Sequence, residues 1–223
     1  MPQPALIFDL DGTLIDTAPD LLGATNAVLR SQGRPPVDPG TLRHMVGFGA
    51  RSLIEQAMAA TGTSVEPSEL PALVEIFLSH YRAHIADESV AFPGVEETLQ
   101  QLADDGERLA VLTNKPQEMA DLLLGALKLD RFFSVIYGAG RMSYVKPDAR
   151  IFHDVVRDLG GEPGIMIGDS ITDVATARAA KAPVILVSYG YTPQPAHSLG
   201  GDAVTDSFAE IPRLARSLKM ITG

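Results

Sequence analysis

The chain has 223 residues, of which 45% are hydrophobic and 21% charged, a composition ordinary for a globular protein. It contains no cysteine, which excludes disulfides, cysteine-ligated zinc, iron–sulfur clusters and thiol nucleophiles. The formal net charge of -10 argues against nucleic acid and anionic membranes as partners, so an anionic small substrate would need a local positive centre. The N-terminal residues lack the basic and apolar segments of a signal peptide, and no apolar run approaches the ~20 residues of a membrane span. We therefore expect a cytoplasmic protein.

The first expected strand is the apolar run from Ala5 to Phe8, which ends at the turn sequence Asp9-Leu10-Asp11-Gly12. Continuous apolar runs of this length are typical of buried strands in parallel sheets.

No strand is expected over the next seventy residues or so, where the periodicity instead predicts helices over 20–31, 50–60 and 69–86. Thr17 is the expected N-cap of the first helix, with Pro19 in its first turn, and Ser68 is the expected cap of the third. This block predicts an all-helical cap domain, residues 16–88, inserted into a core of residues 1–15 and 89–223.

After the turn at Phe92-Pro93-Gly94, apolar runs and helical patterns alternate. Strands are predicted over 109–112, 133–137, 165–167 and 184–187, and helices over 95–102, 119–127 and 151–159. This alternation predicts an α/β fold with a three-layer, Rossmann-like parallel sheet as its core.

Polar side chains follow four of the expected strands, at the edge where open parallel sheets bind their ligands. The segments that carry them are Asp9-Leu10-Asp11-Gly12-Thr13 after the first strand, Thr113-Asn114-Lys115 after the second, Lys146-Pro147 some way after the third, and Asp169-Ser170 with Asp173 after the fourth. We expect four carboxylates, a lysine, a hydroxyl and an amide to converge there.

These carboxylates predict a magnesium site. In extended backbone Asp9 and Asp11 would point the same way, and two like charges so close favour a divalent cation. Carboxylates without His or Cys select Mg²⁺. Asp169 and Asp173 lie four residues apart at a predicted helix start, so the first can ligate the ion and the second can ligate through water or orient the site. The candidate metal residues are Asp9, Asp11, Asp169 and Asp173.

The same group suits phosphoryl transfer. A carboxylate beside Mg²⁺ and a lysine can attack phosphorus and form an aspartyl-phosphate. The transition state needs mainly positioning and charge neutralisation, which Lys146, Thr113 and the backbone amides of residues 10–12 can supply. Gly12 would allow the tight turn that points these amides inward.

Four segments resemble, in order and approximate spacing, the signature motifs of the haloacid dehalogenase superfamily: Asp9-x-Asp11-Gly12-Thr13, Thr113-Asn114, Lys146-Pro147 and Gly168-Asp169-Ser170-x-x-Asp173. The resemblance implies that Asp9 is the nucleophile and Asp11 the general acid and base. It implies that Thr113 and Lys146 hold the phosphoryl group. It also implies that Mg²⁺ lies on the Asp9 carboxylate, the Asp11 backbone carbonyl and Asp169. The family's true dehalogenases lack the second aspartate, so Asp11 favours phosphoryl chemistry.

The helical insertion resembles the C1 cap of that family, and segments 14–21 (LIDTAPDL) and 46–51 (VGFGAR) resemble those of bacterial phosphoglycolate phosphatases. This implies a small phosphorylated metabolite, 2-phosphoglycolate, as the substrate of a phosphatase. The cap is expected to close over it about hinges near residues 14–17 and 88–92. Gly47 and Gly49 would let a cap loop approach the substrate, and Arg51 could form a fork to its carboxylate. The candidate substrate-binding residues are Gly12, Asn114, Gly47, Gly49 and Arg51.

Two alternatives stay open. A phosphosugar phosphatase, a pyrophosphatase or a phosphomutase would use the same site on another substrate. A receiver-like or catalytically silent phosphate-binding protein would hold phospho-Asp9 without turnover, although receivers carry an adjacent acidic pair and no helical insertion. A phosphonate hydrolase would need a lysine in the cap, and residues 16–88 contain none. Oligomeric state and the isomer of the Lys146–Pro147 bond are not fixed by the sequence.

Overall fold

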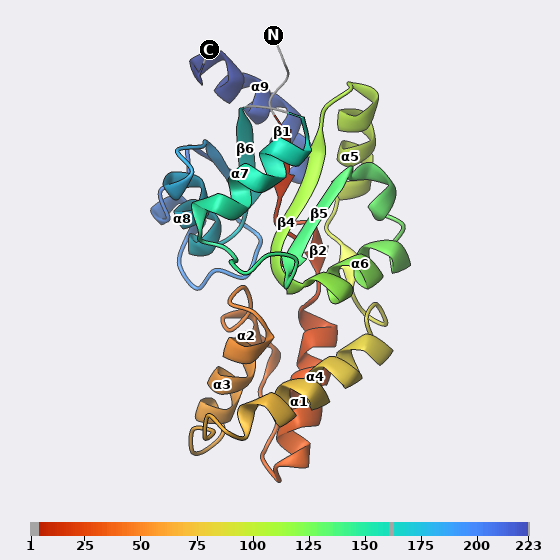
Figure 1. The fold of residues 1–223 in the computed structure, drawn as a ribbon, viewed down its shortest axis with the longest axis vertical. Helices are drawn as coiled ribbons and strands as arrows, with labels where there is room; N and C mark the ends of the chain where they lie inside the picture. Colours follow the sequence, from red (N-terminus) through yellow and green to blue (C-terminus); the bar gives the residue numbers. More distant parts are fainter. Residues whose placement is uncertain (1–4, 161–162, 223) are drawn as a thin grey trace.

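The computed structural model describes residues 5–160 and 163–222, and its centre is a six-stranded parallel sheet (Figure 1). The strands are β1 (Ala5–Phe8), β4 (Leu109–Pro116), β5 (Val135–Ala139), β6 (Gly164–Gly168), β7 (Val184–Val187) and β8 (Ala203–Thr205), in the order β5-β4-β1-β6-β7-β8. The chain runs outward from β1 through β4 to β5, then returns to β6 and runs outward the other way. The connections therefore diverge between β1 and β6, which is where a sheet of this kind binds its ligands.

Both faces of the sheet are covered, because alternate residues of each buried strand point to opposite layers. On one face Leu6 and Phe8 pack with helices α5 (Val95–Asp104), α6 (Gln117–Ala126) and α9 (Ile211–Thr222). On the other face Ala5 and Ile7 pack with α7 (Ala149–Asp158) and α8 (Ile171–Ala179). The predicted three-layer α/β core is confirmed.

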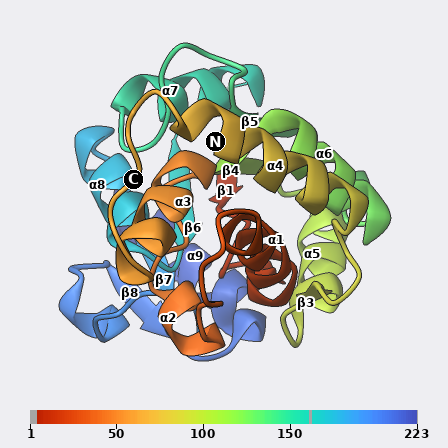
Figure 2. The same ribbon diagram turned by 90° about the horizontal axis from the view of Figure 1, so that it is seen from below.

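Four helices occupy the far end of the molecule, beyond the carboxyl edge of the sheet (Figure 1). They are α1 (Ala18–Ser31), α2 (Pro39–Arg43), α3 (Ala50–Ala60) and α4 (Leu70–Ala83). Their apolar faces form a separate cluster around Leu29, Leu42, Ile54 and Phe77. Figure 2 looks along the molecule from this end and shows these helices in front of the sheet. Within the described part of the chain, no helix combines the length and apolar character that crossing a membrane requires.

Two linkers join the helical segment to the sheet, and they run side by side. The strands β2 (Ile15–Asp16) and β3 (Val90–Ala91) pair antiparallel. The buried carboxylate of Asp20, in the first turn of α1, fastens the second linker. It accepts hydrogen bonds from the backbone N–H of Glu88 at 3.1 Å, the N–H of Ser89 at 2.8 Å and the Ser89 hydroxyl at 2.6 Å. A short sheet and one carboxylate thus hold both linkers at the predicted hinge positions.

The structure corrects one predicted strand. The run 133–137 forms a strand only from Val135, and that strand continues to Ala139. Phe133 instead follows a short 3₁₀ turn, and its ring packs on Phe8 with centroids 6.2 Å apart. The apolar character of Phe133 therefore reflects its packing under the sheet edge, not a place in the strand.

The ends of the helices also differ in detail from the prediction. Thr17 occupies the N-cap of α1, but its hydroxyl makes no capping hydrogen bond. α4 begins one residue later than predicted, with Glu69 rather than Ser68 at its N-cap, and it ends at Ala83. The elements β2, β3, β8, α2 and α9 have no counterpart in the sequence-based assignment. The domain boundaries at 16 and 88 stay a prediction.

We expect Asp20→Ala to destabilise the fold by ~2–3 kcal/mol, because it leaves the buried Ser89 N–H without an acceptor and removes charge-assisted hydrogen bonds. Urea denaturation measures this change in the free energy of unfolding. The exposed Asp206 provides the control, since Asp206→Ala should alter stability by less than ~0.5 kcal/mol. Equal effects of the two substitutions would contradict the role given to Asp20.

Candidate active site

Three carboxylates and one ammonium meet where β1 and β6 end. The Lys146 Nζ lies 2.9 Å from Asp9 Oδ2 and 2.6 Å from Asp173 Oδ1. Carboxylate oxygens of Asp9, Asp169 and Asp173 all lie within 4.8 Å of one another, and all four side chains are buried. The Lys146–Pro147 peptide bond is cis. The structure therefore brings together four of the residues expected at this edge of the sheet.

The negative charge of this group is not fully balanced. Burial raises the pKa of Asp9 to about 7, against the opposing effect of the Lys146 charge. Burial and the charges of Asp173 and Asp9 raise the pKa of Asp169 to about 8. Burial alone would lower the pKa of Lys146, but the neighbouring carboxylates of Asp173 and Asp9 raise it above its ordinary value. One ammonium serves two carboxylates and leaves the third without a cation.

Asp173 has a structural role in addition to its contact with Lys146. Its Oδ2 accepts from the Ser170 N–H and hydroxyl, at 3.1 and 2.7 Å, and from the Asp169 N–H at 3.2 Å. This is the capping box that begins α8. Both oxygens of Asp173 are thus engaged, which suits the orienting role considered for it above.

Asp169 is held by two groups to which sequence reasoning assigned no role. The Thr13 hydroxyl donates to its Oδ1 at 3.0 Å, and the Tyr191 N–H donates to its Oδ2 at 2.7 Å. Gly12 has φ +82°, and a Cβ there would lie 2.6 Å from Asp169 Oδ2. Gly12 therefore provides the predicted turn and also leaves room for Asp169. Thr13 lies within the first motif, whereas only the position of Tyr191 after a strand could have drawn attention to it.

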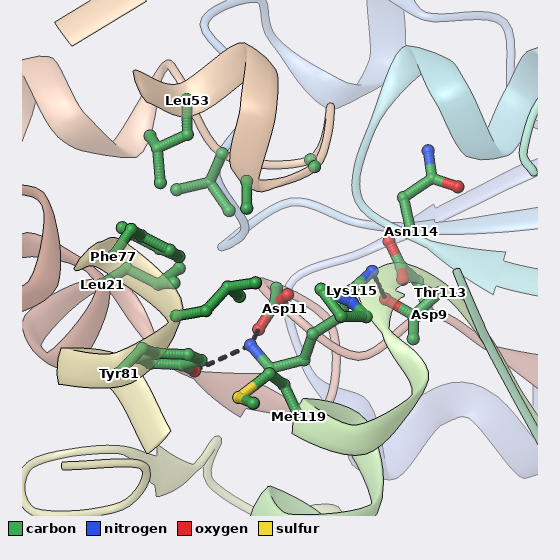
Figure 3. A pocket seen from close by; sticks show the side chains of 16 residues that line it. Asp9, Asp11, Leu21, Leu53, Phe77, Tyr81, Thr113, Asn114, Lys115 and Met119 are labelled. Atoms are coloured by element: carbon green, nitrogen blue, oxygen red, sulfur yellow. Dashed lines mark hydrogen bonds and ion pairs between the residues drawn. The ribbon is translucent and has the colours of Figure 1, made fainter. Parts of the chain in front are cut away.

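Asp11 lies apart from this carboxylate group and has its own cation. Its Oδ1 accepts from Lys115 Nζ at 2.8 Å, and the same ammonium donates to the Tyr81 hydroxyl at 2.7 Å (Figure 3). Tyr81 belongs to α4, so this chain of contacts joins the helical segment to the sheet. The side chains of Asp9 and Asp11 pair with different lysines, Lys146 and Lys115, and the assignment of both aspartates to one metal site stays a prediction. The Asp11 side chain also lies outside the group that could hold a metal.

Burial also affects the pKa values of Lys115 and Tyr81. Burial alone would lower the pKa of Lys115, but the charge of Asp11 and the hydrogen bonds to Asp11 and Tyr81 raise it above its ordinary value. Burial raises the pKa of Tyr81 to about 12, so its hydroxyl is neutral at physiological pH. Lys115 therefore stays a cation beside a neutral phenol. Sequence reasoning noted Lys115 after the strand but gave it no role.

A cavity of about 500 Å³ lies between the sheet edge and the helical segment (Figure 3). Four groups from the sheet side line it beside Lys115, namely Asp9, Asp11, Thr113 and Asn114. The opposite wall is largely apolar and comes from the helical segment, with Leu21, Val46, Ala50, Leu53, Phe77 and Leu78. A second cavity, of about 360 Å³, is lined by Asp11, Asp169, Ser170 and residues of the loop before α3. Asp11 lines both cavities.

The predicted substrate-binding residues divide into two groups. Gly47 and Gly49 line the main cavity, with φ +103° and +85°, and a Cβ on Gly49 would lie 3.7 Å from the Asn114 carbonyl. Asn114 also lines it, and its Nδ2 donates to the Lys146 carbonyl at 3.1 Å, which links the two motif loops. Its Oδ1 is buried and has no hydrogen-bond partner among the described residues.

Arg51 does not line either cavity. Its side chain is 64% exposed and pairs with Glu55, one turn later on the same helix, at 3.4 Å. The buried residues of α3 are Leu53, Ile54, Ala57 and Met58, and this helical register turns Arg51 toward solvent. A contact from Arg51 to a substrate carboxylate stays a prediction.

The carboxylate group suits a hard divalent cation. Its donors are carboxylate oxygens, without His or Cys among the described residues that form it, and oxygen ligands are those that Mg²⁺ prefers. Burial, together with the charges of neighbouring carboxylates, raises the pKa values of Asp9 and Asp169, and a bound divalent ion would favour their ionised forms. The residues present therefore fit the predicted metal.

Comparisons with known proteins agree with this geometry. The family model for haloacid dehalogenase-like hydrolases matches residues 6–187. A phosphoglycolate phosphatase of Caulobacter vibrioides is 45% identical over 215 residues, which cover 96% of this chain and 91% of that protein. One of Agrobacterium fabrum is 42% identical, covering 94% and 91%. A crystal structure of a predicted phosphoglycolate phosphatase from Haemophilus somnus superimposes with a TM-score of 0.90, at 29% identity, covering 95% of this chain and 97% of that one. The chain belongs to the haloacid dehalogenase-like hydrolase family and is an enzyme of the phosphoric monoester hydrolase class.

Proposed function

We propose that this enzyme is a Mg²⁺-dependent phosphatase that hydrolyses 2-phosphoglycolate through an aspartyl-phosphate on Asp9. The observation that carries the proposal is the buried group of Asp9, Asp169 and Asp173 around Lys146, at the border of a cavity between sheet and helices. The identity of the substrate is supported by the relatives named phosphoglycolate phosphatase. A cytoplasmic location stays part of the proposal.

Asp9, Asp169 and the Asp11 backbone carbonyl would hold the metal, and Asp173 would orient the site through Lys146 and the start of α8. When bound, Mg²⁺ would neutralise the negative charge of the phosphoryl oxygens and of the carboxylates that approach them. The chain's own contribution is a buried framework that fixes these carboxylates before the substrate arrives.

In the first step a carboxylate oxygen of Asp9 attacks phosphorus, and the bond from phosphorus to the leaving oxygen breaks. Asp11 in its protonated form donates a proton to that oxygen, which leaves as the alcohol group of glycolate. Lys146 and Thr113 hold the equatorial oxygens, together with the backbone amides of residues 10–12.

In the second step water attacks the phosphorus of phospho-Asp9. Asp11, now a carboxylate, accepts a proton from the water, and the bond from phosphorus to Asp9 breaks to release phosphate. The step restores both aspartates, so the cycle balances without a further reactant.

The helical segment, residues 16–88, would act as the cap that encloses the substrate. The paired linkers at residues 15–16 and 90–91 lie where the hinges were expected, and the loop with Gly47 and Gly49 lines the cavity. Exclusion of water would protect phospho-Asp9 and strengthen the contacts to the phosphoryl group.

Asp9→Asn should lower kcat for phosphomonoesters by at least ~10³-fold, because the amide cannot form the covalent intermediate. Steady-state hydrolysis, together with mass spectrometry of acid-quenched wild-type enzyme for phosphate on Asp9, checks this. Asp206→Asn, at an exposed site, should leave turnover unchanged. An Asp9→Asn enzyme with near-wild-type activity would refute the nucleophile.

A panel of phosphomonoesters should place 2-phosphoglycolate highest in kcat/KM, above phosphosugars and pyrophosphate. Colorimetric phosphate release at matched substrate concentrations gives the ranking. Preference for a hexose phosphate would favour a phosphosugar phosphatase, and formation of a sugar bisphosphate would favour a mutase. Stable phospho-Asp9 with no release of phosphate would favour a silent receiver-like protein.

Mg²⁺ should stabilise the protein more at about pH 9 than at about pH 5. In the metal-free fold Asp9 and Asp169 keep their protons to about pH 7 and 8, whereas the unfolded chain loses them near pH ~4. These raised pKa values favour the fold at low pH, and that stabilisation is lost as pH rises through them. Mg²⁺ binds the ionised carboxylates and offsets the loss. Thermal denaturation with and without Mg²⁺ measures the effect.

The matched variant for this measurement is Asp169→Asn, which should abolish the Mg²⁺-dependent rise in Tm. EDTA should abolish turnover by the wild-type enzyme and Mg²⁺ should restore it. An equal Mg²⁺ effect at both pH values would argue against these carboxylates as the metal site.

A further inference from the structure

Charged side chains of both signs line the main cavity, but only one of the described lining residues is a cation. Among the described residues that line it, Asp9 and Asp11 are acidic and Lys115 is basic. The wall formed by the helical segment offers Leu21, Leu53 and Phe77 but no cation (Figure 3). Among the described residues of this lining, an anionic group on the substrate, distant from the phosphate, would find a positive partner only at Lys115.

Two of the three N–H donors of the Lys115 ammonium have hydrogen-bond partners among the described residues. Its side chain is 2% exposed, and its Nζ donates to Asp11 Oδ1 at 2.8 Å and to the Tyr81 hydroxyl at 2.7 Å. The Nζ also lies 4.5 Å from the centre of the Tyr81 ring. An ammonium has three donors, so one N–H has no acceptor among the described residues. Because Lys115 lines the cavity, a substrate oxygen can accept this third hydrogen bond.

The position of Lys115 along β4 suits a short substrate. It lies two residues after Thr113, where the pairing of β4 with β5 is irregular, and its backbone N–H donates to the Thr113 hydroxyl at 3.1 Å. Both residues line the cavity. The Lys115 ammonium also lies 2.8 Å from Asp11, the proposed proton donor to the leaving oxygen. A carboxylate held at Lys115 would thus lie close to that oxygen, as it does in a molecule with one or two carbons between the two anionic groups.

We propose that Lys115 binds the second anionic group of the substrate, a carboxylate in the case of 2-phosphoglycolate, and that it determines specificity for phosphomonoesters with an anionic end. Tyr81 of α4 positions the ammonium. This inference rests on the proposed function, and it gives Lys115 the role that the sequence pattern suggested for Arg51.

The test compares 2-phosphoglycolate with ethyl phosphate, which has a methyl group in place of the carboxylate. Wild-type enzyme should prefer 2-phosphoglycolate in kcat/KM by roughly 10- to 100-fold, the effect of a charge-assisted hydrogen bond. Lys115→Met should bring this ratio close to one. Lys115→Arg should retain part of it, and Tyr81→Phe should reduce it several-fold by loosening the ammonium. The ratio separates recognition from general damage, which would lower both rates together.

Matched controls are Lys181→Met, at an exposed turn, and Arg51→Ala, and both should leave the ratio unchanged. A Lys115→Met enzyme that keeps the wild-type ratio would overturn the role of Lys115 while the proposed function stands. Loss of the ratio in Arg51→Ala would assign it to Arg51 instead.

If Lys115→Met does not fold, the kcat/KM values of the wild-type enzyme for the two esters still test the proposal. Equal kcat/KM for the two esters in the wild-type enzyme would overturn it. Failure of the wild-type enzyme to hydrolyse either ester would overturn the proposed function and this inference together.

Discussion

The ends of two neighbouring strands and the first turn of α8 bring three buried carboxylates together. A single buried ammonium, that of Lys146, balances part of their negative charge. It contacts Asp9 and Asp173 directly, and Asp169 is left with hydrogen bonds alone. Burying an unpaired carboxylate is costly, so the group favours whatever adds positive charge, either protons or a divalent cation. The fold can place these groups so closely because β1 and β6 are adjacent in the sheet and the connections diverge between them. The same imbalance of charge suits this group to a divalent metal ion.

A second buried lysine, Lys115, forms an ion pair separate from those of Lys146. Lys146 contacts Asp9 and Asp173, whereas Lys115 contacts Asp11 and lines the cavity under the helical segment. A chain with a formal charge of -10 thus places two buried lysines beside the carboxylates at the ends of its strands. The segments also meet at Tyr191, whose N–H binds Asp169 and whose hydroxyl contacts Asp16 and the start of α1. Tyr191 therefore contacts both the first linker and the carboxylate group.

The sequence predicted the core well because parallel strands are buried on both faces and appear as plain apolar runs. The strands over 109–112, 165–167 and 184–187 lie within β4, β6 and β7. The run from Phe133 shifted because an aromatic residue can pack under a sheet without belonging to it. The site residues that sequence reasoning placed best are those whose spacing forms a motif. The burial of Lys115 and the exposure of Arg51 could not be predicted, because both depend on packing between segments distant in the chain.

The most direct test of this account is a crystal structure of the enzyme with Mg²⁺ and vanadate, which mimics phosphorus during transfer. The account predicts Mg²⁺ on Asp9 and Asp169, and vanadium bonded to a carboxylate oxygen of Asp9 within reach of Lys146 and Thr113. Mg²⁺ bound elsewhere, with Lys146 still the only cation in contact with this carboxylate group, would contradict it.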